Sequence, residues 1–206
     1  MLAHIVAGLL LAAGCSDWQH DVTLQGVAFS KVRTVSNGRL IGQIAADTVV
    51  QGRPCAQGWL HLHPNGVPAV FAAAQEIRVP RGTIPAGTWV FQDSAGVVTI
   101  CAFPQDTLVQ GHLCRGSGGP KGVQTSFYPD GALRQFFLVQ PTVIDGVPCA
   151  TGLIRGAVEL HENGRLKSCA LDGDFVRDGV KLGKGTRITL TMDGRILKRG
   201  GGEDAN

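Results

Sequence analysis

Five cysteines beyond the N-terminal region carry the most reactive side chains of the sequence. They are Cys55, Cys101, Cys114, Cys149 and Cys169. None belongs to a Cys-x-x-Cys pair, so their spacing indicates neither a zinc site nor a thioredoxin-like redox site. They could be buried thiols that act as small apolar side chains, or they could form disulfides in an oxidising compartment. Cys149 and Cys169 are the first possible disulfide to test, and an odd total leaves at least one thiol unpaired.

Three histidines are weak candidates for a metal site. His61 and His63 lie two residues apart, which places them on one face of a strand. His161 occupies the same position as His63 in a later repeat, and Tyr128 occupies it in another. A cross-strand histidine cluster could hold a metal ion. The competing interpretation, which we favour, is a solvated polar face with no metal.

The sequence contains no pattern typical of an enzyme. It has no Gly-x-Ser-x-Gly, no His-Glu-x-x-His and no phosphate-binding loop, and its scattered carboxylates do not suggest a converging acid–base pair. We therefore expect no catalytic residue and no cofactor. A net charge of +3 without clusters of Lys and Arg argues against nucleic-acid binding. Trp59 directly precedes the inward-facing Leu60 on a strand, so its side chain should point to the opposite face. Trp59 is therefore a candidate residue of an exposed binding face, together with Tyr128.

The elements that carry these residues recur along the chain. Six corners ending in Gly are spaced by about 28 to 35 residues, which is typical of repeat proteins. The glycines of these corners are Gly38, Gly66, Gly96, Gly131, Gly164 and Gly194. Most corners read Asn-Gly or Asp-Gly, a strong signal for a hairpin turn.

The side chains around each corner favour a three-residue loop. Pro64 and Pro129 begin two of the corners, and Pro suits the second residue of a type I turn. Apolar residues stand four positions before four of these glycines, at Leu62, Phe127, Leu160 and Leu190, and two positions after most of them, as Leu166 does. A three-residue loop places these two columns opposite each other on one face of the hairpin, whereas a two-residue loop would separate them.

A second signature precedes each hairpin, namely a β-branched residue, a spacer and Gly, followed three positions later by an apolar residue. Examples are Val50-Gln51-Gly52 with Cys55 and Val109-Gln110-Gly111 with Cys114. We interpret the signature as a short strand, a turn and the entry to the hairpin, so that a repeat has three short strands. The predicted fold is all-β: an antiparallel meander or solenoid of about six imperfect β-hairpin repeats in a single elongated domain.

These repeats resemble a known family. Phe127-Tyr128-Pro129-Asp130-Gly131-Ala132-Leu133 and residues 160–167 (LHENGRLK) are similar to the bacterial variant of the MORN repeat and to exported, mostly uncharacterised repeat proteins. The resemblance spans residues 23 to 199 and implies the hairpin architecture. The chain lacks the regular Tyr-x-Gly-x-Trp unit, so the lipid-binding roles of some MORN proteins are not carried over, and neither is any catalytic residue.

The N-terminus resembles an export signal. Residues 1–14 (MLAHIVAGLLLAAG) hold an apolar run too short to span a bilayer, and they lead to Cys15 through small residues, as in a bacterial lipobox. The resemblance implies that Cys15 is lipidated and becomes the new N-terminus. A cleaved secretory signal and a buried N-terminal helix are the alternatives, and the absence of Lys or Arg before the run suggests a truncated start.

The sequence thus predicts a lipoprotein-type signal peptide (1–14), a tether (15–22), a repeat domain (23–199) and a disordered tail (200–206). The expected function is that of a non-enzymatic cell-envelope lipoprotein, placed in the outer membrane by resemblance of Ser16 to the sorting signal. It would present one sheet face to a protein or glycan partner. An envelope-polymer hydrolase and a metal-binding protein are the alternatives.

Overall fold

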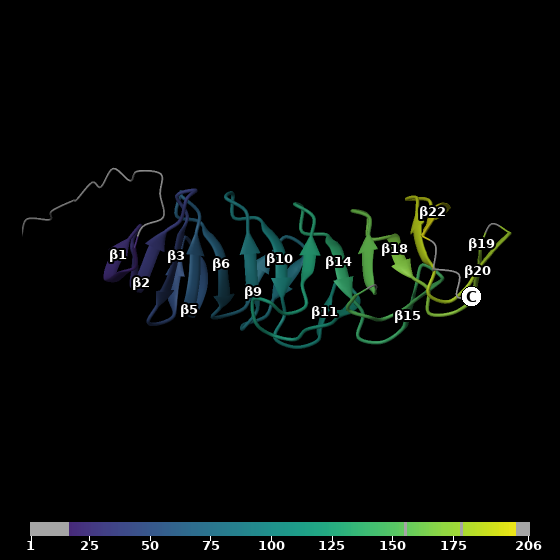
Figure 1. Cartoon of the computed structure of the whole chain (residues 1–206), viewed down its shortest axis with the longest axis horizontal. Coiled ribbons are helices and arrows are strands. Elements are labelled where there is room, and N and C mark those ends of the chain that lie inside the picture. Colours follow the sequence, from purple (N-terminus) through teal and green to yellow (C-terminus); the bar gives the residue numbers. More distant parts are fainter. Residues whose placement is uncertain (1–16, 155, 178, 201–206) are drawn as a thin grey trace, which may run out of the picture.

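The computed structural model describes residues 17–154, 156–177 and 179–200, and every regular element in these ranges is a β-strand. The strands lie side by side along the long axis of an elongated molecule (Figure 1). All pairings are antiparallel. The predicted all-β meander is therefore confirmed.

The main sheet has 14 strands, and thirteen of them follow one another in space in the order of the chain, with β4 paired beside β5. Its strands are β1 (Gln19–Leu24), β2 (Val27–Thr34), β3 (Leu40–Ile44), β4 (Thr48–Val50), β5 (Arg53–Leu62), β6 (Pro68–Ala73), β9 (Trp89–Gln92), β10 (Val98–Ala102), β13 (Thr125–Phe127), β14 (Leu133–Phe137), β17 (Ala157–Leu160), β18 (Leu166–Ala170), β21 (Arg187–Leu190) and β22 (Ile196–Gly200). Each strand thus contacts mainly its neighbours in sequence.

Short hairpins form a second layer. Four of them are separate two-stranded sheets: β7 (Ile77–Val79) with β8 (Gly82–Ile84), β11 (Thr107–Val109) with β12 (His112–Cys114), β15 (Thr142–Ile144) with β16 (Val147–Cys149), and β19 (Phe175–Arg177) with β20 (Val180–Leu182). The pair β4–β5 and the pair β1–β2 begin the first repeats in the same way. A repeat therefore has a short and a long hairpin. Our prediction of three strands per repeat missed one, because the turn signature also begins a second paired strand.

The Gly corners are the three-residue loops that the sequence predicts. At the second corner, the amide of Gly66 donates to the carbonyl of His63, and the amide of His63 donates to Val67. Leu62 then pairs with Pro68, as Leu160 pairs with Leu166 in a later repeat. The two apolar columns therefore meet on one face. A register shift follows the loop in every long hairpin except β2–β3. In four of these hairpins it turns the residue five positions after Gly inward, and these residues are Phe71, Cys101, Phe136 and Cys169.

The turns of the short hairpins are two-residue turns of a different type. At Gln51-Gly52 both residues have positive φ, and Val50 pairs with Arg53 across them. This is the pattern of a type I′ turn, whose first position is usually Asn, Asp or Gly. Gln110 and Asp145 adopt the same conformation with positive φ. Three glutamines hold this conformation, at positions 25, 51 and 110, so hydrogen bonds of their side chains must help to hold the turns.

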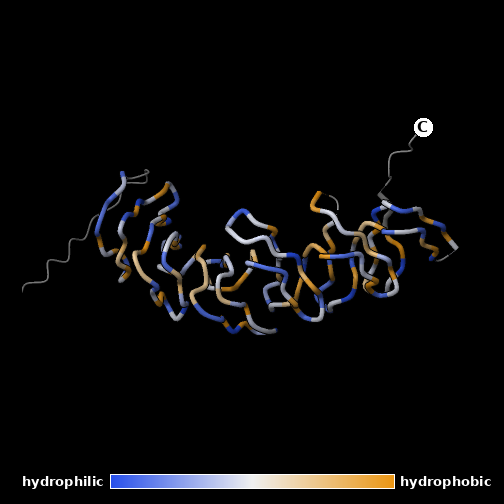
Figure 2. The backbone as a smooth tube through the Cα atoms, turned by 90° about the horizontal axis from the view of Figure 1, so that it is seen from below, coloured by the Kyte–Doolittle hydropathy of each residue, from blue (hydrophilic) through white to orange (hydrophobic). Residues whose placement is uncertain are grey.

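The short hairpins cover the inner face of the main sheet. The open ends of β11–β12 and β15–β16 pair with the residues that follow β14 and β18, as Cys114 does with Leu138, and their turns reach the next Gly corner. There Gln110 accepts the amide of Leu133 at 2.9 Å and donates to the carbonyl of Gly131 at 2.8 Å. The two layers enclose one apolar core that runs along the whole molecule. Figure 2 shows the matching alternation of apolar and polar residues along the backbone.

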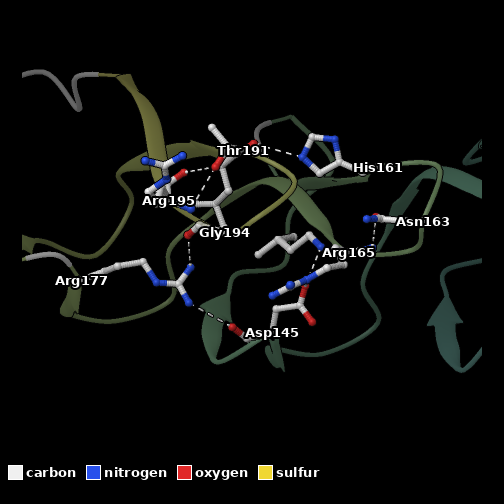
Figure 3. A network of polar contacts seen from close by, with 10 residues as sticks. Asp145, His161, Asn163, Arg165, Arg177, Thr191, Gly194 and Arg195 are labelled. Atoms are coloured by element: carbon white, nitrogen blue, oxygen red, sulfur yellow. Dashed lines mark hydrogen bonds and ion pairs between the residues drawn. The ribbon is translucent and has the colours of Figure 1, made fainter.

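A similar set of contacts closes the last repeats. The carboxylate of Asp145 accepts the amide of Leu166 at 2.8 Å, in the same way as Gln110 accepts Leu133. The guanidinium of Arg177 donates to the carbonyls of Gly194 and Asp145, which joins two adjacent short hairpins to the last Gly corner (Figure 3). Contacts of this kind tie each repeat to the next.

The structure moves two predicted boundaries. Strand β1 begins at Gln19 and pairs with β2, so residues 19–22 belong to the sheet and not to a tether. Strand β22 includes Gly200, so the predicted tail loses its first residue. Both corrections have the same cause, because a sheet edge can add polar residues through backbone hydrogen bonds alone. The predicted signal peptide, Cys15 and residues 201–206 lie outside the described residues.

Candidate binding face

Two tryptophans and two cations meet on the outer face of the first strands. The rings of Trp18 and Trp59 pack edge to face with centroids 6.1 Å apart, and each ring is 38% exposed. The ammonium of Lys31 lies 5.5 Å from the centroid of Trp18 and 5.2 Å from that of Trp59. The guanidinium of Arg33 lies 4.9 Å from Trp18. These are cation–π distances, which orient the four side chains relative to one another.

The strand pattern brings these residues together. Lys31 and Arg33 alternate with the buried Val32 on β2, so both point away from the core. Lys31 pairs with Gln43, which in turn pairs with Trp59 on β5. Outward alternation and antiparallel register therefore place residues 31 and 59 over the same patch of sheet. We call Trp18, Lys31, Arg33, Arg39, Trp59 and His61 the aromatic–basic face.

A cross-strand row extends outward from this face over the main sheet. Direct register partners continue it from Arg33 through Ile41, His61, Val70, Phe91 and Ile100. Every side chain of this stretch is half-buried. Three of these positions are aliphatic and one is aromatic, so the first half of the outer sheet presents an apolar surface beside the cations.

The cations of the aromatic–basic face are not neutralised by the chain itself. Within residues 17–154, 156–177 and 179–200, Lys31, Arg33 and Arg39 form no ion pair. The Nε atoms of Arg33 and Arg39 are buried and have no hydrogen-bond partner in that part of the chain. Burial, and to a lesser degree the charge of Arg39, lower the pKa of His61 below its usual range. The face therefore carries positive charge that forms no ion pair with any anion of the described residues.

The structure places the two candidate binding residues, Trp59 and Tyr128, in different surroundings. Trp59 lies on the aromatic–basic face, where its ring contacts that of Trp18. Tyr128 does not, because it lies beyond the apolar row, where its hydroxyl donates to the carbonyl of Leu160 at 2.8 Å. Sequence reasoning missed Lys31 and Arg33. Their alternation with Val32 marked them as outward residues, but only the strand register shows that they meet Trp59.

The three candidate histidines do not come together as metal ligands. The Nε2 atom of His63 is 2.9 Å from the carbonyl of Gln92, and that of His161 is 3.1 Å from the carbonyl of Leu190. Each imidazole thus joins its Gly corner to a strand of the next repeat, and Tyr128 makes the equivalent contact. No group of three or more His, Cys, Asp or Glu in the described ranges is placed to hold a metal ion.

A small cavity of about 170 Å³ is lined by residues of three consecutive repeats. Arg53, Arg78, Val98 and Phe127 are among the residues that line it. Its lining includes no carboxylate, histidine, cysteine or hydroxyl side chain. The cavity therefore offers an apolar ligand a site, but it offers no group for acid–base or nucleophilic catalysis.

All five cysteines of the repeat domain are buried. Burial raises the pKa of Cys55, Cys101 and Cys114 to about 12. A thiol with such a pKa is protonated at neutral pH and is a poor nucleophile. The interpretation of these cysteines as core side chains therefore fits the structure.

No helix in the described ranges is long and apolar enough to cross a membrane. No protein-family model matches the chain, and no curated protein or solved structure matches it either.

Proposed function

We propose that this chain is a non-enzymatic, lipid-anchored envelope protein whose aromatic–basic face binds an anionic glycan. The observation that carries the proposal is a set of cations with no ion pair in the described residues, placed around two partly exposed tryptophans on one sheet face. A tryptophan ring can stack on the apolar C–H face of a sugar ring. A guanidinium can bind a sugar carboxylate, sulfate or phosphate through two parallel hydrogen bonds.

The shape of the surface supports a polymer more than a small ligand. Repeat proteins build extended faces, and the apolar row runs from Ile41 to Ile100 across consecutive strands. A chain of sugars could lie along this row with its charged end or charged substituents at Lys31 and Arg33. The aromatic side chains would supply contact area and the cations would select for negative charge.

Titration calorimetry with a defined polyuronate oligosaccharide tests the proposal, with a neutral oligosaccharide of equal length beside it. We expect the polyuronate to bind and the neutral chain to bind at least tenfold more weakly. Raising the salt concentration should weaken polyuronate binding, because exposed charges are screened. Equal affinity for both glycans, or no binding of the polyuronate, would overturn the proposal. Binding of an acidic peptide but not of the polyuronate would also overturn it.

Two variants locate the site. Trp59→Ala should lower the affinity at least tenfold, and so should the double variant Lys31→Ala/Arg33→Ala. The matched control is Arg134→Ala, because Arg134 is an exposed cation 5.8 Å from the ring centroid of Tyr128. The control should bind as the parent protein does. An equal loss in all three variants would show that the charge effect is not confined to the aromatic–basic face.

The anchor has its own test. If Cys15 is lipidated, the protein will fractionate with membranes, and Cys15→Ser will leave a soluble form or an unprocessed precursor. Unchanged fractionation of this variant would remove the anchor from the proposal and leave the glycan site to its own test.

A further inference from the structure

The two layers of the repeat domain meet through a series of side-chain pairs. In each pair one residue comes from a short hairpin and the other from the long strand beneath it. The interlayer pairs include two direct contacts, Phe29 with Gly42 and Cys149 with Cys169. Equivalent positions in the other repeats align Cys55 with Phe71, Ile84 with Cys101, and Cys114 with Phe136. The register is the same in three repeats: Cys55, Cys114 and Cys149 pair through the backbone with residues 73, 138 and 171, each two positions after the long-strand member.

In four of these pairs a large side chain opposes a small one. Phe29 fills the space above Gly42 so closely that a Cβ on this glycine would lie 2.6 Å from the Phe29 ring. By the same alignment of the repeats, Phe71 and Phe136 oppose Cys55 and Cys114, and Ile84 opposes Cys101. Such complementary sizes keep the distance between the layers roughly constant, as close packing of a protein interior requires.

Cys149 and Cys169 form the one interlayer pair of these five in which both members are small. Both are fully buried, and their sulfur atoms lie 2.7 Å apart. No large side chain separates the layers at this point, so the two thiols are in direct contact. The same register that places a phenylalanine under Cys55 and Cys114 places a second sulfur under Cys149.

We infer that Cys149 and Cys169 form a disulfide that joins the two layers of the fifth repeat covalently. The reaction is an exchange with an external disulfide oxidant. The thiolate of one cysteine attacks a sulfur of the oxidant, forms a mixed disulfide and releases one oxidant thiol. The second cysteine then attacks the mixed disulfide, forms the Cys149–Cys169 bond and releases the other thiol. The two cysteines lose two electrons and two protons, and the oxidant is reduced to its dithiol form.

The bond must form before the layers close. Contact with Cys169 and burial raise the pKa of the Cys149 thiol above its usual range, so the folded protein contains little thiolate and little access for an oxidant. During folding the thiols are exposed and 20 residues apart in sequence, a spacing that favours ring closure. The folded protein should then protect the bond from reductants for the same reason.

The experiment uses the full chain, exported and purified without reductant. After denaturation, alkylation should leave two of the five cysteines of the repeat domain unmodified, and non-reducing peptide mapping should find residues 149 and 169 in one linked product. Reduction of the denatured protein should add two to the count of alkylated cysteines. Alkylation of all five cysteines of the repeat domain before reduction would overturn the inference. A linkage among Cys55, Cys101 and Cys114 instead would overturn it as well.

A stability measurement separates the bond from simple packing. Reduced and refolded wild type should melt about 5–10 °C below the oxidised form, given the loop length. The double variant Cys149→Ser/Cys169→Ser should melt at one temperature with or without reductant. Cys169→Phe supplies the large side chain of the equivalent pairs and should also be indifferent to reductant. The matched control Cys114→Ser should keep the full response to reductant. A wild type that melts at one temperature in both states would contradict the inference, whatever the variants do.

Discussion

The two halves of the outer sheet face share one backbone register and differ in chemistry. From Arg33 to Ile100 the cross-strand row is basic at one end and otherwise mostly apolar. From Ser126 onward the same row continues through Gln135, Glu159, Ser168 and Thr189. The inner face shows no such division, since apolar residues fill it in both halves. Packing therefore constrains the inner face throughout, whereas the outer face is free to differ.

The two halves also differ in how their charged side chains are paired. In the second half, Glu159 pairs with Lys167 at 3.6 Å and with Arg187 at 3.4 Å, and Arg187 also donates to Ser168. In the first half, Lys31 and Arg33 contact tryptophan rings and form no ion pair in the described part of the chain. Glu159 pairs with neighbouring cations, whereas Lys31 and Arg33 have no such partner among the described residues. An external anion would therefore gain more beside Lys31 and Arg33 than beside the cations that contact Glu159.

The prediction with the largest expected effect tests whether packing constrains the inner face. Gly42→Ala places a methyl group 2.6 Å from the Phe29 ring and 2.7 Å from the carbonyl of Lys31, so the strands must shift. We expect a loss of about 1–3 kcal/mol in the free energy of unfolding, measured by urea denaturation. The neighbouring outer-face variant Ile41→Ala is the control and should lose about 1 kcal/mol or less. A smaller loss for Gly42→Ala than for Ile41→Ala would refute the contrast between the faces.

The second prediction concerns a variant that gives the first half of the outer face a carboxylate, as Glu159 does in the second half. His61→Glu places a carboxylate near Arg39 and in the cross-strand row that begins at Arg33. We expect polyuronate affinity to fall at least tenfold, or about 1.4 kcal/mol, because the new anion competes for the cations. The melting temperature should stay within a few degrees of the parent. Unchanged affinity would mean that the unpaired cations do not bind the glycan.

The third prediction concerns a feature that the two halves share. His63 in the first half and His161 in the second each contact a backbone carbonyl of the next repeat. Truncation to alanine should cost about 1 kcal/mol in either case, because each removes one hydrogen bond from a half-buried group. Chemical denaturation of the two variants measures this directly. A large difference between them would show that the joints between repeats are not equivalent along the molecule.

The smallest effect is a dependence of stability on pH. Because the pKa of His61 is lowered in the folded state, the unfolded chain takes up a proton first as the pH falls. Stability should therefore be complete above the usual histidine pKa of about 6.5 and should decline below it. Melting curves at pH 7.5 and pH 5.5 measure the decline, which His61→Gln should reduce. A steeper decline in the variant would contradict the sign of the shift.

Much of the fold follows from local rules. Pairing of Leu160 with Leu166 could be predicted, because loop length fixes the phase of the paired strands next to the turn. The inward direction of Phe71 and Phe136 does not follow from loop length, because a register shift after each loop changes the phase. The second strand of each short hairpin could not be predicted, since Gln51 and Gln110 are unusual residues for a type I′ turn. These turns depend on hydrogen bonds to a neighbouring repeat, which no local pattern reveals.

The candidate site was harder to predict than the fold. The outward position of Trp59 followed from its neighbour Leu60, but its contact with Lys31 depends on the register between β2, β3 and β5. Tyr128 and His161 occupy the same position before the turn of their repeats, and the sequence there indicated a polar surface. In the structure, both side chains form hydrogen bonds to the next repeat. Spacing within one strand predicts the face of a residue, whereas a site needs the alignment of several strands.

The order of strands along the main sheet has a mechanical consequence. Each strand pairs with those that precede and follow it in the chain, so a pulling force at either terminus would detach strands one at a time from the edge. A linkage between layers would interrupt such unzipping at the repeat that contains it. With the N-terminus held at a membrane, β1 and β2 would carry the tension first, and the aromatic–basic face would come apart before the far end of the molecule.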